Sequence, residues 1–241
     1  MYTWVPGQPF AAARRAFAES YADHPASVSH ELVIMVKGTA APRSRRPDLI
    51  RARWIAVGED GYDIGPFMAL ALGEYRDYDR VVLMGAYSRI LGDGWLAKLT
   101  AAGPLASATG SYEIRPHLRT TALSVAPYLL ALMFDPPDGW SKKDCWRFEH
   151  GPDNLFATAR EHGVEGVVVG RDGVAYREAD WPGAGIYRIG HQPNLLVADN
   201  HTDLYAGADT ITRARLSSGS WAEPENILDP WPHWGRLMEQ R

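Results

Sequence analysis

The chain has 241 residues, of which 46% are hydrophobic and 22% are charged, and its formal net charge at pH 7 is -4. This length is enough to bury one sizeable core and fits a single domain, and the composition is not that of a disordered chain. The negative net charge argues against a protein whose whole surface binds nucleic acid or an anionic membrane.

In the first half of the chain, helical and strand-like patterns alternate. We expect helices at residues 11–24, 65–76 and 93–103, and strands at 31–38, 52–58, 79–88 and within 104–113. Asp93 and Gly103 have the residue types that cap and end a helix. The alternation predicts an α/β fold with a mixed, mostly parallel sheet flanked by helices. In this fold residues 1–115 form a Rossmann-like, nucleotide-binding half.

The second half is less regular. We expect a strand running into a helix at 117–133, a loop at 135–144, a helix at 154–163 that Asp153 caps, and a strand at 164–170. Residues 176–207 are rich in Gly, Pro and aromatic residues, which is typical of a mobile or ligand-contacting region. Residues 1–241 are therefore read as one domain, with a second half at 116–215, which the resemblance described below assigns to the acceptor, and a tail at 216–241 that wraps the body.

The single cysteine and the apolar runs indicate the cellular compartment in which the protein is expected. Cys145 is the only cysteine, which excludes an intrachain disulfide and a cysteine-cluster metal site and favours a reducing compartment. Two neighbouring lysines could activate its thiol, but a lone cysteine is more often a passive small hydrophobe. The N-terminus does not resemble a signal peptide, and the most apolar run, residues 121–134, is too short to span a bilayer. We expect a cytoplasmic protein without a membrane span.

The stretch GEDGYDIG, residues 58–65, gathers three acids and three glycines where a strand meets a helix. In parallel sheets, ligands bind beyond the carboxyl ends of strands. The spacing is neither the dinucleotide fingerprint nor a phosphate-binding loop with its lysine. Carboxylates here would accept hydrogen bonds from ribose or sugar hydroxyls or from a base N–H. Asp63 could instead simply cap the following helix, and the residue types leave both interpretations open.

Residues 58–71, GEDGYDIGPFMALA, resemble the N-x-G-x-D-I-G-P-[FY] signature of the rhamnan-synthesis and family-2-like glycosyltransferases. Residues 78–99, 104–113 and 195–205 resemble further segments of these enzymes in the same order, so the resemblance covers roughly residues 28–215. It implies the GT-A fold and the transfer of a sugar from a nucleotide sugar, most readily a UDP-sugar, to a hydroxyl group.

The resemblance also implies the residues of a donor site. It places Asp60, Gly61, Asp63 and Gly65 around the nucleotide, while Ser88 and Arg89 stand where a hydroxyl and a guanidinium could bind phosphate oxygens. Two departures matter. Glu59 replaces the usual asparagine, and the strand end at 83–89 lacks the Asp-x-Asp pair that holds a divalent metal in many GT-A enzymes. Dependence on Mg²⁺ or Mn²⁺ therefore does not follow from the sequence.

For the chemistry, the resemblance favours Glu149 as the base that takes the acceptor proton, with inversion if the displacement is direct. A surface glutamate stabilised by a nearby helix dipole is the competing interpretation. Asp199 and His201 are candidates for the diphosphate or a metal. Trp146, Trp181 and Tyr187 stand in segments that would border the acceptor, although most aromatic residues pack in the core.

The acceptor and the class of protein stay open. The acceptor could be a glycan, a protein or hydroxymethylated DNA, and the DNA alternative depends on the arginine-rich residues 43–53. A second hypothesis is a non-catalytic carbohydrate-binding or assembly protein on a degenerate glycosyltransferase fold, which the missing Asp-x-Asp pair favours.

Overall fold

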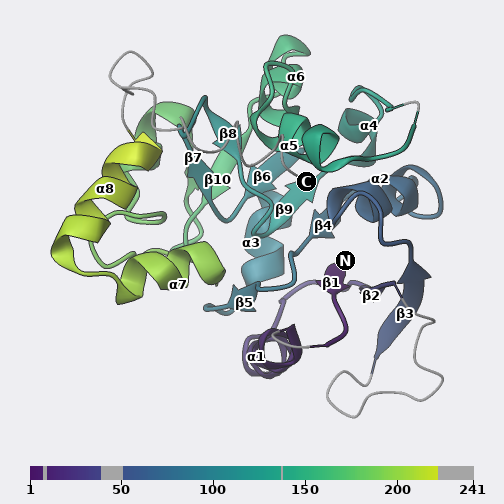
Figure 1. Ribbon diagram of the computed structural model, residues 1–241, viewed down its shortest axis with the longest axis horizontal. Coiled ribbons are helices and arrows are strands. Elements are labelled where there is room, and N and C mark those ends of the chain that lie inside the picture. The colour runs from purple at the N-terminus through teal and green to yellow at the C-terminus, as the bar shows by residue number, and fades with distance from the viewer. Residues whose placement is uncertain (8–9, 39–50, 137, 222–241) are drawn as a thin grey trace, which may run out of the picture.

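The computed structural model describes residues 1–7, 10–38, 51–136 and 138–221, and it has the mixed α/β architecture expected from the sequence (Figure 1). Its strands are β1 (Tyr2–Trp4), β2 (Leu32–Lys37), β3 (Ala52–Val57), β4 (Val81–Leu83), β5 (Arg89–Ile90), β6 (Leu105–Ser107), β7 (Gly110–Ser111), β8 (His117–Leu118), β9 (Leu123–Val125), β10 (Val167–Val169), β11 (Ala175–Tyr176) and β12 (Val197–Ala198).

The helices are α1 (Phe10–Asp23), α2 (Ile64–Leu72), α3 (Trp95–Ala101), α4 (Pro127–Leu130), α5 (Lys142–His150), α6 (Leu155–Glu161), α7 (Asn200–Gly207) and α8 (Thr210–Trp221), with a 3-10 helix at Glu178–Gly183. Among the described residues no helix combines the length and apolar character needed to cross a membrane.

The two main sheets are joined edge to edge. The first has the order β1-β2-β3 and is parallel throughout, and the second has the order β11-β10-β6-β9-β4. A parallel bridge between Tyr2 and Met84 links β1 to the end of β4. The chain therefore leaves β1 on one side through β2 and β3, and it returns on the other side of β1 through β4. The strand order reverses at β1 and β4.

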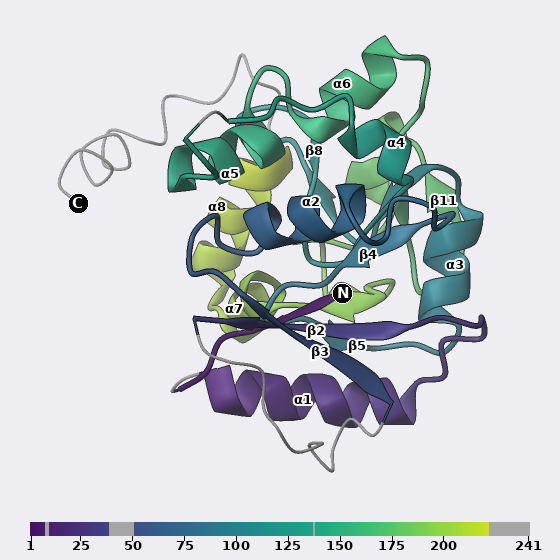
Figure 2. The same ribbon diagram turned by 90° about the vertical axis from the view of Figure 1, so that its right-hand side faces the viewer.

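Helices cover both faces of the joined sheets, and Figure 2 shows α1 on one side with α2, α5 and α6 on the other. Strand β2 explains this layering, because all six of its residues are buried and successive side chains point to opposite faces. Val33 and Met35 pack with α2, α4, α5 and α6, whereas Ile34 and Val36 pack with α1 and α3. A strand buried on both faces reads as a continuous apolar run, which is what made residues 31–38 predictable.

The expectation of a mostly parallel sheet is only partly correct. In the five-stranded sheet, β6 and β10 pair in parallel, but β9 is antiparallel to both β4 and β6, and β11 is antiparallel to β10. Strands from residues 1–115 and from residues 116–215 lie side by side in this sheet, so the two expected halves share one sheet.

Several local predictions need correction. Asp93 does not cap α3, because Gly94 in the left-handed conformation precedes that helix and the Asp93 carboxylate pairs with His24 at 2.7 Å. Residues 142–144, expected to end a loop that begins at residue 135, form the first turn of α5. Residues 176–207, expected to be a mobile or ligand-contacting region, place many of their side chains in the core. Residues 216–221, expected to begin an irregular tail, form the end of α8. Residues 222–241 of that tail lie outside the described residues.

Candidate functional site

The candidate site lies at the carboxyl ends of the parallel strands, where the strand order reverses between β1 and β4. This is the position at which open α/β sheets bind ligands. The loop at residues 58–63 borders it and is held by Lys37, the last residue of β2. The Lys37 ammonium group donates to the carbonyl oxygens of Glu59 at 2.7 Å, Asp60 at 3.1 Å and Tyr62 at 2.6 Å. The lysine therefore fixes the shape of the loop that leads to Asp63.

Asp63 stands at the start of α2 but does not cap it. Its backbone is already helical and its side chain accepts no hydrogen bond from the helix, so the capping interpretation is wrong. The carboxylate instead points to the end of β4, where a Cβ atom at Gly85 would stand 3.2 Å from Asp63 Oδ2. No residue in the described part of the chain donates a hydrogen bond to it.

The surroundings of Asp63 disfavour its charge. Burial, and after it the negative charge of Glu149, raise the pKa of Asp63 to about 6, although the nearby Lys37 acts in the opposite direction. A half-buried carboxylate without a donor and with a raised pKa is the kind of group that functional sites retain. It has unused acceptor capacity for a ligand that carries hydroxyl or N–H groups.

The raised pKa predicts that Asp63→Asn stabilises the protein near neutral pH. The folded-state pKa of about 6 exceeds the ordinary value of 3.8, so the folded state gains stability as Asp63 takes up its proton and loses it as pH rises through 6. Asparagine removes that loss, with an expected gain on the order of 1–3 kcal/mol at pH 8. Urea unfolding at pH 4 and pH 8 measures it.

The control for this prediction is Asp60→Asn, because the Asp60 side chain is exposed in the same loop. We expect its effect to stay within about 0.5 kcal/mol. A gain for Asp63→Asn that is equal at both pH values would contradict the assigned cause.

Glu149 lies close to Asp63, although it does not stand where the sequence suggested. It belongs to the last turn of α5, and the helix that follows is capped by Asn154, while Asp153 pairs with Arg147. The half-buried Glu149 carboxylate accepts hydrogen bonds from the Thr120 hydroxyl at 2.7 Å and the Thr120 amide at 3.3 Å, both through Oε1.

Helix α5 is attached to the loop at residues 58–63 through Cys145. Its thiol donates to the carbonyl oxygen of Gly61 at 3.2 Å. Burial, followed by Glu149 and Asp63, raises the pKa of Cys145 to about 12, so the thiol is protonated at neutral pH. A protonated thiol argues against a nucleophilic Cys145, and its hydrogen bond to Gly61 links α5, which carries Glu149, to the loop.

Arg119 and Asp199 form a buried ion pair beside Glu149. Arg119 Nη1 lies 3.1 Å from Asp199 Oδ2, and the two side chains are 13% and 9% exposed. The guanidinium lies over the Tyr187 ring, 4.3 Å from its centroid. Burial alone would raise the pKa of Asp199, but Arg119, the Thr121 hydroxyl and the Thr202 amide lower it to about 2.

Asp199 has no acceptor capacity to spare. Its Oδ1 accepts from the amides of His201 and Thr202, which caps α7, and its Oδ2 accepts from the Thr121 hydroxyl at 2.6 Å and from Arg119. A divalent cation beside Arg119 would be repelled by the guanidinium, so Asp199 and His201 do not fit the expected metal. Over the described ranges no three His, Cys, Asp or Glu side chains are grouped as metal ligands.

His201 lies at the solvent-exposed edge of the same cluster. Partial burial of the ring and the positive charge of Arg119 lower the pKa of His201, although Asp199 acts in the opposite direction. The imidazole is therefore neutral at pH 7 and can hydrogen bond to a ligand, but it adds no positive charge for a diphosphate.

The expected phosphate contacts are not positioned for that role. Ser88 is buried and its hydroxyl donates to the Thr121 carbonyl at 2.5 Å. Arg89 turns towards α7 and pairs with Asp203 at 2.8 Å. At Gly61 and Gly65 a Cβ atom would stand within 3 Å of Trp140 Cβ. Their missing side chains make room for Trp140 on that side.

Two of the three expected acceptor aromatics are in the core. Trp181 and Tyr187 are each 1% exposed, and the Trp181 indole donates to the Tyr176 carbonyl at 3.0 Å. The ring of Tyr187 packs against the guanidinium of Arg119. Trp146 alone is accessible, with 42% of its surface exposed, and it stacks on His150 one turn along α5. It lies on the helix that carries Glu149.

The sequence interpretation missed Lys37, Arg119 and the threonines at 120 and 121. Lys37 closes a buried apolar strand, which is an uncommon position for an unpaired lysine and was a usable signal. Arg119 carried no such signal, because its partner Asp199 is distant in the chain. Of the arginine-rich segment, Arg43, Arg45 and Arg46 lie outside the described residues, and Arg53 pairs with Glu74.

Comparison with known proteins adds no relative. No protein-family model matches the chain, and no curated protein matches it. The functional inference therefore depends on the site itself and on the sequence resemblance.

Proposed function

We propose that the protein is a glycosyltransferase that moves a sugar from a nucleotide-sugar donor to a hydroxyl acceptor. The observation that carries the proposal is Asp63, a carboxylate that no described residue engages, set at the carboxyl ends of the parallel strands within the electrostatic reach of Glu149. A nucleotide sugar supplies what such a carboxylate lacks, because its ribose hydroxyls and base N–H groups are donors. The resemblance of residues 58–71 to the GT-A family supports the same assignment.

In this proposal Glu149 is the base. It takes the proton of the acceptor hydroxyl while the acceptor oxygen forms a bond to the anomeric carbon, and the bond from that carbon to the diphosphate breaks with its electron pair leaving on the phosphate oxygen. Thr120 supports this role because its hydroxyl and amide both bind Oε1, which leaves Oε2 with no donor in the described part of the chain. The product is the glycosylated acceptor and a nucleoside diphosphate.

Arg119 is the cation best placed to offset the charge that develops on the leaving diphosphate. Its side chain is fixed between Asp199 and the Tyr187 ring, and Glu149 is among the groups that act on it electrostatically. A guanidinium held rigidly in a partly dry site stabilises a developing charge without having to reorganise. Arg119 is thus a candidate to stabilise the negative charge of the diphosphate, as a metal held by the Asp-x-Asp pair does in many GT-A enzymes.

The acceptor side of the proposal depends on Trp146. Its exposed ring lies one turn before Glu149 on the same face of α5, and an aromatic face of this kind packs against the apolar C–H surface of a sugar. This exposed ring favours a glycan acceptor.

One observation favours a non-catalytic carbohydrate-binding protein instead. Ser88, Arg89 and Asp199, which the resemblance assigns to the diphosphate, are all engaged by other protein groups. A degenerate fold would bind glycans without a nucleotide and would turn over no donor.

A donor panel tests the proposal. We expect one of the UDP-, GDP- or dTDP-sugars to raise the melting temperature by roughly 5–10 °C at about 100 times its Kd, and to be slowly hydrolysed. The panel is run in EDTA and again with Mg²⁺ or Mn²⁺. Absence of any nucleotide or nucleotide-sugar binding at millimolar concentration contradicts the proposal, and glycan binding without nucleotide favours the alternative.

A further inference from the structure

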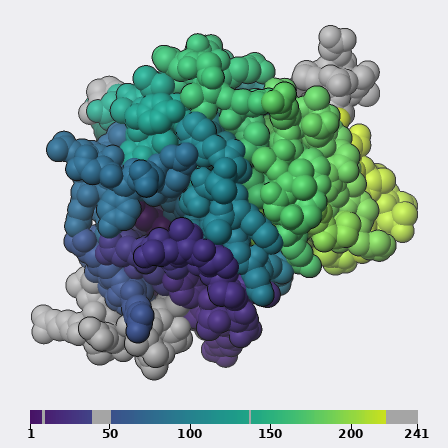
Figure 3. Space-filling view, turned by 180° about the vertical axis from the view of Figure 1, so that it is seen from behind, coloured from purple at the N-terminus to yellow at the C-terminus, as the bar shows by residue number. Residues whose placement is uncertain are grey.

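A second concavity lies at the other end of the sheet, next to the amino ends of β2 and β4. It has a volume of about 260 Å³, and Figure 3 shows this side of the molecule, with a hollow between the purple N-terminal segment and the blue segment that follows α2. Its apolar floor is made by Leu32, Val33, Val82, Met84 and Leu96. Lys37 stands at the opposite end of β2 and is not among the residues that line this cavity.

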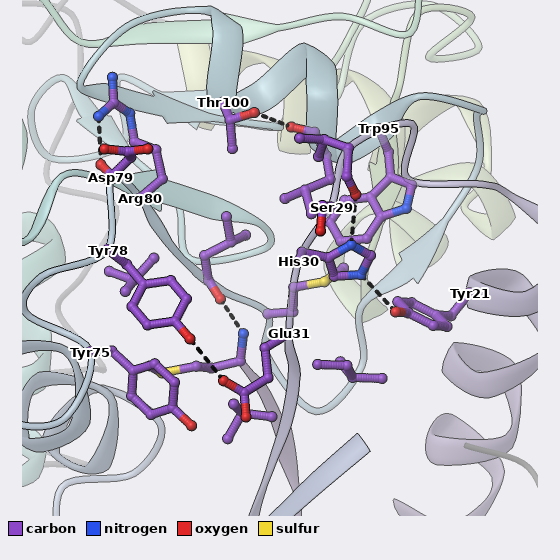
Figure 4. Close-up of a pocket in the computed structure, with 18 residues that line it drawn as sticks. Tyr21, Ser29, His30, Glu31, Tyr75, Tyr78, Asp79, Arg80, Trp95 and Thr100 are labelled. Carbon is purple, nitrogen blue, oxygen red and sulfur yellow. Dashed lines mark hydrogen bonds between the residues drawn. The ribbon is translucent and has the colours of Figure 1, made fainter. Parts of the chain in front are cut away.

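Aromatic rings line two opposite sides of this cavity (Figure 4). Tyr75 and Tyr78 form one wall, with ring centroids 5.3 Å apart. Tyr21 and Trp95 form the other with His30, and the Tyr21 and Trp95 centroids are 6.4 Å apart. The faces of such rings carry partial negative charge and attract cations.

A carboxylate stands between the two walls. Glu31 Oε2 accepts a hydrogen bond from the Tyr78 hydroxyl at 3.0 Å, and no donor in the described ranges reaches its other oxygen. Arg80 and the Met1 ammonium belong to the lining but donate elsewhere. Arg80 donates to the carbonyl oxygens of Gly103 at 3.0 Å and Asp79 at 2.6 Å, and Met1 donates to the Val82 carbonyl at 2.6 Å. Burial lowers the pKa of the Met1 ammonium to about 5, although Glu31 acts in the opposite direction. In Figure 4 the Arg80 guanidinium lies at the margin, away from Glu31.

The Met1 ammonium and Arg53 act on Glu31 electrostatically, but neither donates a hydrogen bond to it within the described ranges. Both ring nitrogens of His30 are hydrogen bonded, one to the Tyr21 hydroxyl at 2.7 Å and the other to the Val28 carbonyl at 2.9 Å. Asp79 adds a second carboxylate to the lining. The hydrogen bond to Glu31 raises the pKa of Tyr78, and burial followed by Glu31 raises the pKa of Tyr75, although Arg53 acts in the opposite direction on both.

We propose that this cavity binds a small organic ammonium ion. The cationic head would lie between the two aromatic walls against the free oxygen of Glu31, and its apolar body would cover the strand floor. The volume is slightly below the roughly 300–1,000 Å³ of drug-sized pockets, which selects a compact ligand. Attraction of an ammonium group to ring faces and to a carboxylate is the usual basis for recognising such ions.

Choline and 3,3-dimethylbutan-1-ol, which share a shape and differ in charge, test the proposal directly. Titration of the full chain, followed by NMR, measures both dissociation constants. We expect choline to bind at least about tenfold more tightly, because the cation–π and carboxylate contacts are available only to the charged compound. Equal affinity for the two compounds, or no binding of choline at tens of millimolar, overturns the proposal.

Variants locate the binding. Glu31→Gln and Tyr78→Ala alter exposed positions, and each should weaken choline binding about tenfold while leaving the neutral compound nearly unaffected. Glu19→Gln, an exposed acid on α1 outside the cavity lining, and Asp63→Asn at the candidate site should leave both affinities unchanged. Undiminished choline binding by Glu31→Gln would overturn the proposal.

Discussion

Replacing Glu149 by glutamine is expected to lower the turnover of a nucleotide-sugar donor by roughly 10²–10⁴-fold, because an amide cannot accept the proton of the acceptor hydroxyl. Glutamine keeps a side-chain oxygen that can accept the hydrogen bonds from Thr120, so the fold and donor binding should be retained. Initial rates of nucleoside diphosphate release, measured with the donor that the thermal-shift panel identifies, give the effect.

The matched control is Glu161→Gln, which changes an exposed glutamate at the end of α6. Its rate should stay near that of the unmodified protein. Turnover near wild type in Glu149→Gln would remove Glu149 from the mechanism, whereas a loss of donor binding with unchanged stability would assign it to the donor instead.

Replacing Arg119 by methionine is expected to produce the largest loss of stability, about 3–5 kcal/mol, because it leaves the buried Asp199 carboxylate without its cation. The side chains of this pair are 13% and 9% exposed. The double variant Arg119→Met with Asp199→Asn should recover much of the loss, since the uncompensated charge is gone. Urea unfolding of the two single variants and the double variant measures the coupling.

An exposed pair provides the control. Arg89 and Asp203 pair at 2.8 Å, but their side chains are 36% and 58% exposed, so Arg89→Met should cost only about 0–1 kcal/mol. The pKa of Asp199 is lowered to about 2, so the stability that it supplies should be present above pH 4 and lost as pH falls towards 2. Equal losses for Arg119→Met and Arg89→Met would contradict this account.

The stability gain expected for Asp63→Asn and the rate loss expected for Glu149→Gln describe the same part of the molecule. Two carboxylates near one another, one of them without a donor, are costly to keep in the folded state. We infer that such a cost persists because a bound ligand supplies the missing donors, as the proposed function requires.

The elements that the sequence predicted best are those whose burial pattern is local. Residues 31–38 read as a buried strand and residues 11–24 as a helix, and both were confirmed as β2 and α1. The sequence analysis did not predict helix α5. Its start nevertheless carries a recognisable signal, a capping box of the S-x-x-D type formed by Ser141 and Asp144. The antiparallel direction of β9 left no trace in the sequence, since a three-residue strand with two apolar residues reads the same in either direction.

Within the candidate site, the sequence alone determined the acids and glycines of residues 58–65 and their place between a strand and a helix. It could not decide whether Asp63 caps α2 or faces a ligand, because both roles use the same residue type. The tertiary structure excludes the cap, because the carboxylate lies over Gly85 and near Glu149, away from the helix amides.

The same division holds for the charges. Ser88, Arg89 and Asp199 were plausible phosphate or metal contacts by type, and the structure engages each of them with a residue from another segment. Arg119 became the central cation only because the chain brings β8 next to the start of α7. Residue type fixes which chemistry a side chain is capable of, but its partners and burial decide which charge is left for a ligand, and both arise only when distant segments pack together.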